Sequence, residues 1–123
     1  MIPEDLIKKA REAQKRAKAM YSDYAVGAAL LTTDNQVILG CNIESKAYPT
    51  TICAERVAIF SAISQGYTKF KAIAVVTKDG GMPCGSCRQI IHEYSNGIPI
   101  YVSDQNENFK TFNISSLLPH PFG

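Results

Sequence analysis

The spacing of hydrophobic and polar positions changes several times along the chain, and each change predicts a different element. Over residues 3–20, apolar residues recur at helical spacing, which predicts an amphipathic helix. Pro3 suits its first turn, and Glu4 and Asp5 favour the positive end of the helix dipole. The predicted buried stripe consists of Leu6, Ala10, Ala13, Ala17 and Met20. The other faces carry lysine and arginine with Glu12 interleaved, which is typical of a solvated surface.

Two apolar runs follow, at residues 26–32 and 36–43, and both predict strands. Thr33-Asp34-Asn35 between them is typical of a turn, so we interpret the pair as a hairpin. Residues 51–65 return to helical spacing, and this predicted helix stops at a glycine. Residues 70–77 form a short apolar run rich in β-branched side chains, which predicts a buried strand.

The second half of the chain begins with Asp79-Gly80-Gly81, which is typical of a loop. The remaining predicted elements are a helix over residues 84–94 closed by Gly97, a strand over 98–102, a polar turn over 103–108, a last strand over 109–114, and a short final turn capped by Ser115. Because strands and helices alternate in the middle of the chain, the pattern favours a layered α/β sheet with helices on both faces.

Composition places the chain among ordinary globular proteins. Its 123 residues suit one domain spanning 1–123, and this length can bury a core without disulfides. A net charge of +2 is too small to indicate a nucleic-acid or membrane partner. The N-terminus lacks a signal-peptide pattern, and no apolar stretch reaches the length of a membrane span. We therefore expect a cytoplasmic protein, in which four cysteines indicate metal binding or catalysis before disulfides.

Two short motifs carry the candidate chemistry: Cys53-Ala54-Glu55-Arg56 and Pro83-Cys84-Gly85-Ser86-Cys87-Arg88. Three thiols at these spacings can hold one zinc ion and leave its fourth position open. Glu55 follows the first thiol by two positions and can reach a zinc-bound water. This combination is the known signature of zinc deaminases that act on nucleobases, in its three-cysteine form. The motifs therefore predict that Cys53, Cys84 and Cys87 bind zinc.

The order of the elements predicts that two helix N-termini meet at this metal, because Cys53 and Cys84 each lie near a helix start. The positive ends of the two dipoles favour thiolates. Three thiolates and one zinc ion carry a net negative charge, which a cation bonded to sulfur would offset; Arg56 is the first candidate and Arg88 a weaker one. We expect Glu55 to take a proton from zinc-bound water and to return it to the ring nitrogen and the leaving amine.

The cysteines allow three other interpretations. Cys41 could be a fourth ligand of a closed, structural zinc site, although a lone cysteine in an apolar strand usually behaves as a core residue. Cys84 and Cys87 could form a redox pair, which would leave Glu55 unexplained. All of them could also be simple buried thiols. The two histidines, His92 and His120, lack metal-ligand spacing to the cysteines.

The chain resembles the small, homotetrameric cytidine deaminases almost end to end. The segments that carry the resemblance are Tyr21-Ser22-Asp23-Tyr24-Ala25-Val26-Gly27-Ala28-Ala29-Leu30, Asn42-Ile43-Glu44, the two cysteine motifs with Gln89, and Leu117-Leu118-Pro119-His120-Pro121-Phe122. The resemblance implies a three-layer α/β/α sandwich with a five-stranded mixed sheet in the order 2-1-3-4-5. It also implies one zinc ion per subunit and hydrolysis of cytidine and 2′-deoxycytidine in pyrimidine salvage.

The same resemblance implies roles for the substrate-binding residues. Asn42 and Glu44 would hold the ribose hydroxyls, and Ala54 and Glu55 would read the base edge. Tyr24 matches a position on the wall of the nucleoside pocket where the family usually has phenylalanine.

Three further positions match residues that reach a neighbouring subunit. Ala47 and Tyr48 match positions that line a neighbour's site, and Phe122 matches an aromatic residue that stacks on a neighbour's base. The resemblance thus implies active sites shared between subunits of a homotetramer. Next to these positions, Ser45 and Lys46 depart from the asparagine and small residue that are common in the family.

Three rival functions remain open at this stage. A deaminase for another small molecule, such as blasticidin S, would share the zinc site but has no use for Glu44 as a ribose ligand. A polynucleotide deaminase needs a basic, aromatic-lined groove, which the near-neutral charge and short loops do not supply. A structural zinc module has no need for Glu55 beside its ligands.

Overall fold

The computed structural model describes all 123 residues. Its elements in chain order are α1 (Pro3–Gln14), β1 (Gly27–Thr32), β2 (Val37–Cys41), the 3-10 helix η1 (Tyr48–Thr50), α2 (Ala54–Ser64), β3 (Phe70–Val76), α3 (Gly85–Tyr94), β4 (Ile100–Ser103), β5 (Phe109–Phe112) and α4 (Ile114–Leu117). The strands form one five-stranded sheet in the order β2-β1-β3-β4-β5. Only β3 and β4 pair in parallel, so the sheet is mixed, as predicted.

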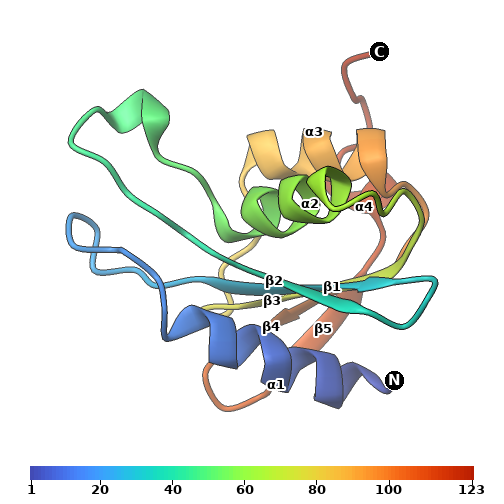
Figure 1. Cartoon of the computed structure of the whole chain (residues 1–123), viewed down its shortest axis with the longest axis horizontal. Coiled ribbons are helices and arrows are strands. Elements are labelled where there is room, and N and C mark those ends of the chain that lie inside the picture. The colour runs from blue at the N-terminus through green and yellow to red at the C-terminus, as the bar shows by residue number, and fades with distance from the viewer.

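The helices lie on both faces of this sheet (Figure 1). Helix α1 covers one face, while α2 and α3 lie side by side over the other, with α4 behind them. The three-layer α/β/α sandwich is therefore confirmed. No helix is both long enough and apolar enough to cross a membrane.

Strand β1 is buried along its whole length because it lies between the two helical layers. Ala28 and Leu30 belong to the larger core cluster, under α2 and α3, while Ala29 and Leu31 belong to the smaller cluster, under α1. Successive side chains of a strand point to opposite faces, so one continuous apolar run supplies both clusters.

The first helix is shorter than its apolar pattern predicts. It ends at Gln14 rather than at residue 20, and Met20 is 66 % exposed instead of buried. The chain after α1 forms a bridge in which Lys18 N donates to Asn42 O and Glu44 N donates to Lys18 O. These bonds use backbone groups that a longer helix would need for itself, so sheet-like pairing ends the helix.

Several boundaries also shift at the second and last helices. Residues 51–53, predicted as helical, are extended because Ile43 and Ile52 exchange two backbone hydrogen bonds of 3.0 Å. The predicted cap at Ser115 is wrong, since Asn113 accepts from Ser116 N and thereby caps α4. Asparagine at a helix start accepts such a bond well. The other elements differ from the prediction only at their ends.

A glycine in β2 brings α2 close to the sheet. A Cβ atom at Gly40 would lie 2.3 Å from the carbonyl oxygen of Ala54 and 2.6 Å from Ala58 N. Only a residue without a side chain permits this approach. The first turn of α2, which follows Cys53, is therefore held directly over the end of β2.

Candidate active site

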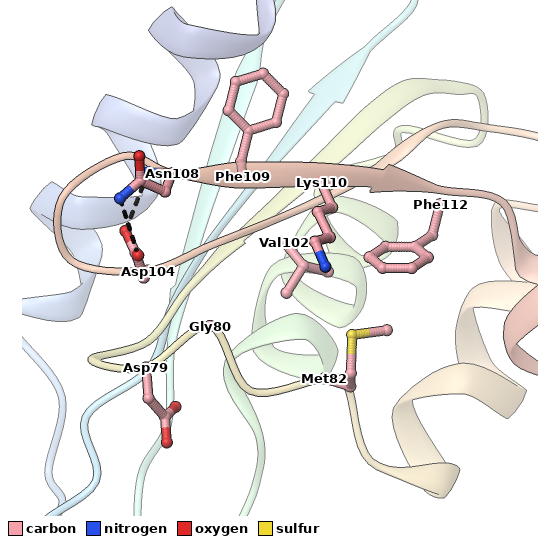
Figure 2. A pocket seen from close by; sticks show the side chains of 9 residues that line it. All are labelled: Asp79, Gly80, Met82, Val102, Asp104, Asn108, Phe109, Lys110 and Phe112. Carbon is pink, nitrogen blue, oxygen red and sulfur yellow. Dashed lines mark hydrogen bonds between the residues drawn. The ribbon is translucent and has the colours of Figure 1, made fainter.

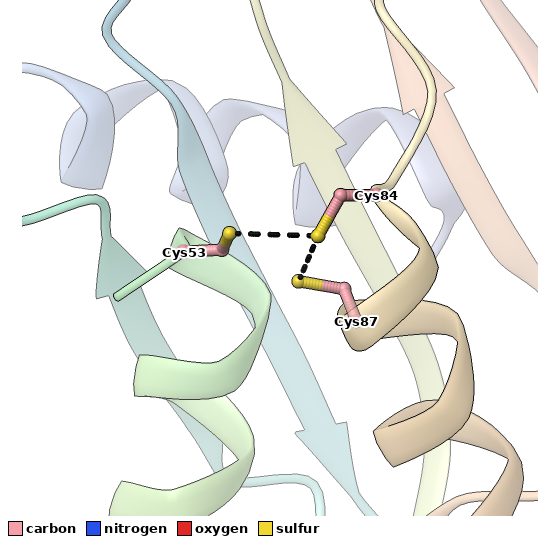
Figure 3. Close-up of side chains that lie close together, drawn as sticks. All are labelled: Cys53, Cys84 and Cys87. Atoms are coloured by element: carbon pink, nitrogen blue, oxygen red, sulfur yellow. Dashed lines mark hydrogen bonds between the residues drawn. The ribbon is translucent and has the colours of Figure 1, made fainter. Parts of the chain in front are cut away.

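Three thiols from two separate parts of the chain meet in the folded protein (Figure 3). The Sγ atoms of Cys53 and Cys84 lie 3.7 Å apart, and those of Cys84 and Cys87 lie 3.5 Å apart. All three sulfurs lie within 4.8 Å of one another. A tetrahedral zinc ion with Zn–S bonds of about 2.3 Å requires sulfurs about 3.8 Å apart, so the cluster suits that metal.

Each cysteine occupies a defined place at a helix start. Cys53 is the N-cap of α2 and Cys84 is the N-cap of α3, while Cys87 lies in the first turn of α3. The two N-termini converge on the sulfurs as predicted, and the partial positive charge there favours thiolates over thiols. Cys41 is not part of this cluster. The closed four-cysteine site is therefore excluded by the geometry.

The thiols of the cluster also perturb one another's ionisation. Interaction with the Cys87 thiol and with the Arg56 guanidinium lowers the pKa of Cys53 to about 5. The Cys53 thiolate and burial together raise the pKa of Cys87. One thiolate thus opposes the formation of the next, and a divalent metal among the sulfurs removes that conflict. A redox pair of Cys84 and Cys87 would not require Cys53, so the meeting of all three thiols favours metal binding over that alternative.

The two arginines that follow the cysteine motifs have different partners. Arg56 donates from Nη2 to the Sγ atom of Cys53 at 3.2 Å, which lowers the negative charge on the cluster. Arg88 instead donates to the carbonyl oxygens of Pro83 and Leu117, both at 2.8 Å. Its predicted role as a weaker candidate beside the sulfurs is wrong, because its guanidinium ties α3 to the loop before it and to α4.

Glu55 is the second residue of α2 and is only 4 % exposed. Burial raises the pKa of Glu55 to about 7, and the negative charge of Cys53 adds to the effect. A carboxyl group with this pKa can both accept and donate a proton near neutral pH. The chain thus places a group suited to acid–base chemistry beside the thiol cluster.

A cavity of about 440 Å³ opens onto Glu55 and onto Cys53 and Cys84. Its lining residues are Ser22, Tyr24, Val26, Asn42, Glu44, Thr51, Ile52, Cys53, Ala54, Glu55, Val75, Thr77, Gly81, Met82 and Cys84. This volume suits a small organic molecule rather than a polymer segment. The structure thus brings Tyr24, Asn42, Glu44 and Ala54, which the resemblance assigns to the substrate pocket, together with Glu55 in one cavity.

Asn42 and Glu44 both make hydrogen bonds within the chain. The side-chain amide of Asn42 accepts from Val26 N at 2.9 Å and donates to Tyr24 O at 2.8 Å. The Glu44 carboxylate accepts from the backbone N–H groups of residues 21 and 22, and the Ser22 hydroxyl holds the pKa of Glu44 below its usual value. A carboxylate with free lone pairs can still accept from a ligand hydroxyl.

Tyr24 has partners that the sequence analysis did not predict. Its hydroxyl donates to Asp79 Oδ1 at 2.6 Å, and the Lys78 ammonium lies 5.5 Å from the ring centroid. Partial burial and the bond to Asp79 raise the pKa of Tyr24, so its hydroxyl keeps its proton near neutral pH. Thr77 and Gly81, which also line the cavity, were not predicted. The only signal for them in the sequence was the loop composition at 79–81.

The three residues expected to reach a neighbour do not line this chain's own cavity. Ala47 and Tyr48 lie on the protruding segment that contains η1, coloured green in Figure 1, and Tyr48 is 74 % exposed. Phe122 is 89 % exposed and lies near the C-terminus, which extends beyond α3. Two bonds of 3.0 Å between the Gln89 side-chain amide and the Phe122 backbone hold this position. Gln89 was not predicted to have this role.

A second cavity, of about 330 Å³, lies between β5 and the loop around Gly80 (Figure 2). It contains no thiol and none of the predicted site residues. Its Asp104 carboxylate already accepts from Asn106 N and Asn108 N within its own loop. Figure 2 shows Asp79 pointing away from this cavity. The chemistry of the chain is therefore concentrated in the pocket beside Glu55.

The chain is similar to known deaminases along its whole length. The family described as "Cytidine and deoxycytidylate deaminase zinc-binding region" matches residues 2–102. A cytidine deaminase from Sporosarcina psychrophila is 44 % identical over 99 % of this chain and 92 % of its own length. One from Halalkalibacterium halodurans is 43 % identical over 95 % of this chain and 91 % of its own length.

Solved structures agree with these sequence matches. A cytidine deaminase from Burkholderia pseudomallei superimposes with a TM-score of 0.95 at 39 % identity, and the match covers 99 % of this chain and 100 % of that one. A cytidine deaminase from Mycobacterium tuberculosis superimposes with a TM-score of 0.85 at 34 % identity, over 100 % and 99 % of the two chains.

Proposed function

The chain belongs to the cytidine deaminase family, and from this premise we propose that it hydrolyses cytidine and 2′-deoxycytidine to uridine and 2′-deoxyuridine. Water replaces the exocyclic amino group at C4, and ammonia leaves. The observation that carries the proposal is Glu55, a buried carboxyl group that lines the cavity together with Cys53 and Cys84. This reaction would give the protein a place in pyrimidine salvage, as one domain spanning residues 1–123.

Cys53, Cys84 and Cys87 are the residues that would hold zinc, one ion per subunit. Zinc bound there would supply the Lewis acidity that makes water nucleophilic near neutral pH. The chain's own part is to keep the thiolates ionised through two helix N-termini and through the bond from Arg56 to Cys53.

Glu55 is the proton carrier in this proposal. Its pKa of about 7 lets the carboxylate take a proton from water and then donate it to N3 of the cytosine ring. A second transfer through the same carboxyl group carries the proton of the new C4 hydroxyl to the amine, which then leaves as ammonia while C4 becomes a carbonyl carbon. Burial supports this role, because a desolvated carboxyl group changes its protonation state near the pH at which the enzyme works.

Asn42 and Glu44 are proposed to bind the ribose. Both line the cavity, and their hydrogen bonds to residues 21–26 hold them in place before substrate arrives. A preorganised carboxylate binds a sugar hydroxyl at a lower entropic cost than a mobile one. Tyr24 and Ala54 would form the wall and floor around the nucleoside.

We also propose a homotetramer in which neighbouring subunits complete each pocket. The aromatic rings of Tyr48 and Phe122 are largely exposed, and both lie outside their own chain's cavity. A depression lined by Ser45 and Tyr48 adjoins that cavity, and the two share Glu44. Exposed aromatic side chains that lie outside their own chain's pocket support a surface that a partner subunit covers.

The first experiment follows the loss of cytidine absorbance with zinc-loaded protein, with uridine identified by chromatography. The parent is expected to convert cytidine and 2′-deoxycytidine, while Glu55→Gln retains zinc and loses turnover. Glu12→Gln, on the exposed surface of α1, is the matched control and is expected to behave as the parent. If the zinc-loaded parent leaves both nucleosides unchanged, the proposed function is wrong.

A further inference from the structure

The Tyr24 hydroxyl joins two segments of the pocket wall that sheet pairing leaves separate. Tyr24 precedes β1 and Asp79 follows β3, and these strands are antiparallel, with Gly27 opposite Val76. The segment before β1 and the segment after β3 therefore lie at the same end of these two strands. The bond of 2.6 Å from Tyr24 to Asp79 Oδ1 closes the gap between them.

The same carboxylate oxygen organises the loop beyond it. Asp79 Oδ1 accepts from Gly81 N at 3.1 Å and from the Thr77 hydroxyl at 3.3 Å. Gly81 N also donates to Thr77 Oγ1 at 2.8 Å. Thr77 and Gly81 line the substrate cavity, as does Met82. Asp79 thus joins this wall of the cavity to the Tyr24 hydroxyl.

The network continues from Tyr24 toward the proposed ribose site. Tyr24 N donates to Ser22 Oγ at 3.1 Å, and the Ser22 hydroxyl donates to the Glu44 carboxylate. Tyr24 thus has one bond on each side: its backbone N–H is bonded to Ser22 beside Glu44, and its hydroxyl is bonded to Asp79 in the loop. This one residue connects the two polar walls of the pocket.

Gly81 is matched to this tyrosine. A Cβ atom at Gly81 would lie 2.3 Å from Tyr24 Oη, which is a clash. The next nearest atoms, Asp79 Oδ1 at 3.4 Å and Tyr24 Cζ at 3.5 Å, would be ordinary contacts. The absence of a side chain at Gly81 is therefore needed only while residue 24 carries a hydroxyl group.

We propose that Tyr24 is a positioning residue whose hydroxyl, through Asp79, holds the Asp79–Met82 loop against the nucleoside pocket and thereby sets KM. This inference rests on the proposed function. The loop lines the cavity, whereas α2 holds Cys53 and Glu55, and α3 holds Cys84 and Cys87. We call the hydrogen bond between the Tyr24 hydroxyl and Asp79 the latch. Losing the latch therefore weakens nucleoside binding and leaves the chemical step intact, which raises KM with little change in kcat.

Steady-state kinetics of Tyr24→Phe and Asp79→Ala with cytidine test the latch. Tyr24→Phe keeps the ring beside Lys78 and removes only the hydroxyl group. We expect KM to rise about threefold to tenfold, in line with one lost hydrogen bond, while kcat stays within about twofold. The double variant is expected to match Asp79→Ala alone. Tyr94→Phe, at the exposed end of α3, is the control.

A reciprocal rescue provides the sharper test. Gly81→Ala is expected to lower the unfolding midpoint and raise KM in the parent, because the new methyl group meets Tyr24 Oη. In the Tyr24→Phe background the same substitution is expected to have a much smaller effect on both. Equal effects of Gly81→Ala in the two backgrounds would overturn the latch, as would an unchanged KM in Tyr24→Phe.

Hydrogen exchange at the Gly81 amide separates this inference from the proposed function. The amide is expected to exchange faster in Tyr24→Phe than in the parent, since one of its acceptors, Asp79, loses its anchor and the other, Thr77 Oγ1, is itself bonded to Asp79. If the parent fails to deaminate cytidine but this difference appears, the proposed function fails and the latch stands. If the parent deaminates cytidine and the exchange rates are equal, the latch is wrong.

Discussion

The proposed site shared between subunits has two halves, and they are built in opposite ways. The half that carries the chemistry lies at two helix N-termini, where Glu55 and Cys87 are buried against the core. The half expected to hold the substrate from outside consists of the η1 segment and the C-terminal tail, where Tyr48 and Phe122 are exposed. One chain thus supplies the whole reactive centre. Its η1 segment and C-terminal tail, which we call the rim, carry exposed aromatic side chains.

The difference suggests that one half sets metal binding and turnover, and that the other half sets substrate affinity. A group that must change its pKa has to be desolvated, and only a packed core does this reliably. An aromatic ring that must contact a substrate from another subunit has to remain outside its own core. Changes in the first half should therefore alter metal binding and turnover, and changes in the rim should alter KM.

The largest expected effect comes from removing a thiol. Cys84→Ser should abolish zinc binding at stoichiometric metal and, with it, cytidine turnover, because the cluster loses one of its three sulfurs. Zinc content after gel filtration and the rate of uridine formation measure both outcomes. Cys41→Ser is the matched control and should keep its zinc, since Cys41 lies outside the cluster. A fully zinc-loaded Cys84→Ser protein would contradict the ligand assignment.

A change in β2, beneath the first turn of α2, should affect the reactive half of the site indirectly. A methyl group at Gly40 would meet the backbone of α2, so Gly40→Ala should destabilise the fold by about 1–3 kcal/mol, as overpacking does. The displaced helix start should also weaken zinc binding through Cys53. Chemical denaturation and a competitive zinc titration measure the two effects.

Gly85→Ala is the comparison variant for the denaturation measurement. A Cβ atom there meets nothing within 4 Å, so its free energy of unfolding should not fall. If Gly40→Ala is as stable as the parent, β2 does not hold α2 in the way described.

In the rim, Phe122→Ala should raise KM for cytidine and leave zinc content unchanged. Stacking of a base on an aromatic ring contributes about 1–3 kcal/mol, so the expected increase is about fivefold or more. Steady-state kinetics and metal analysis distinguish this from damage to the reactive centre. A fall in kcat at constant KM would break the division between the two halves.

Mixing two variants sharpens the same prediction. Glu55→Gln lacks the proton carrier but keeps its tail, and Phe122→Ala keeps the proton carrier but lacks the ring. If neighbouring subunits share sites, hybrid oligomers should contain pockets with the parent KM. Exchange of subunits between the two variants has to be verified first. If the mixture then deaminates cytidine at the sum of the rates of the two separate variants, sharing through Phe122 is excluded.

The smallest expected effect concerns the support of that ring. Gln89 holds the Phe122 backbone by two exposed hydrogen bonds. Gln89→Leu removes both bonds without removing the ring, so KM should rise by about twofold to tenfold, less than for Phe122→Ala. Measuring both variants under one condition tests the order. A larger effect of Gln89→Leu would place the role of Gln89 in α3 rather than in the tail.

Local sequence patterns determined most of the architecture. The order of elements, the layered α/β sheet and the meeting of Cys53, Cys84 and Cys87 all agree with the prediction, and the mixed five-stranded sheet agrees with what the family resemblance implies. The reason is physical, since hydrophobic period, turn composition and the spacing of thiols around a helix start act over a few residues and can be read in sequence. The family resemblance supplied the sheet order and the substrate-binding positions.

Only the tertiary structure decided how the helix of residues 3–20 ends and which side chains hold the pocket walls. The bonds from Lys18 to the end of β2 stop α1 at Gln14, although the apolar spacing continues. The bond between Tyr24 and Asp79 spans 55 positions, and those between Gln89 and Phe122 span 33. Such contacts follow from the packing of whole layers and leave no periodic signal in the chain. The sequence therefore determined the layers and the thiol cluster, and the folded layers determined the pocket around them.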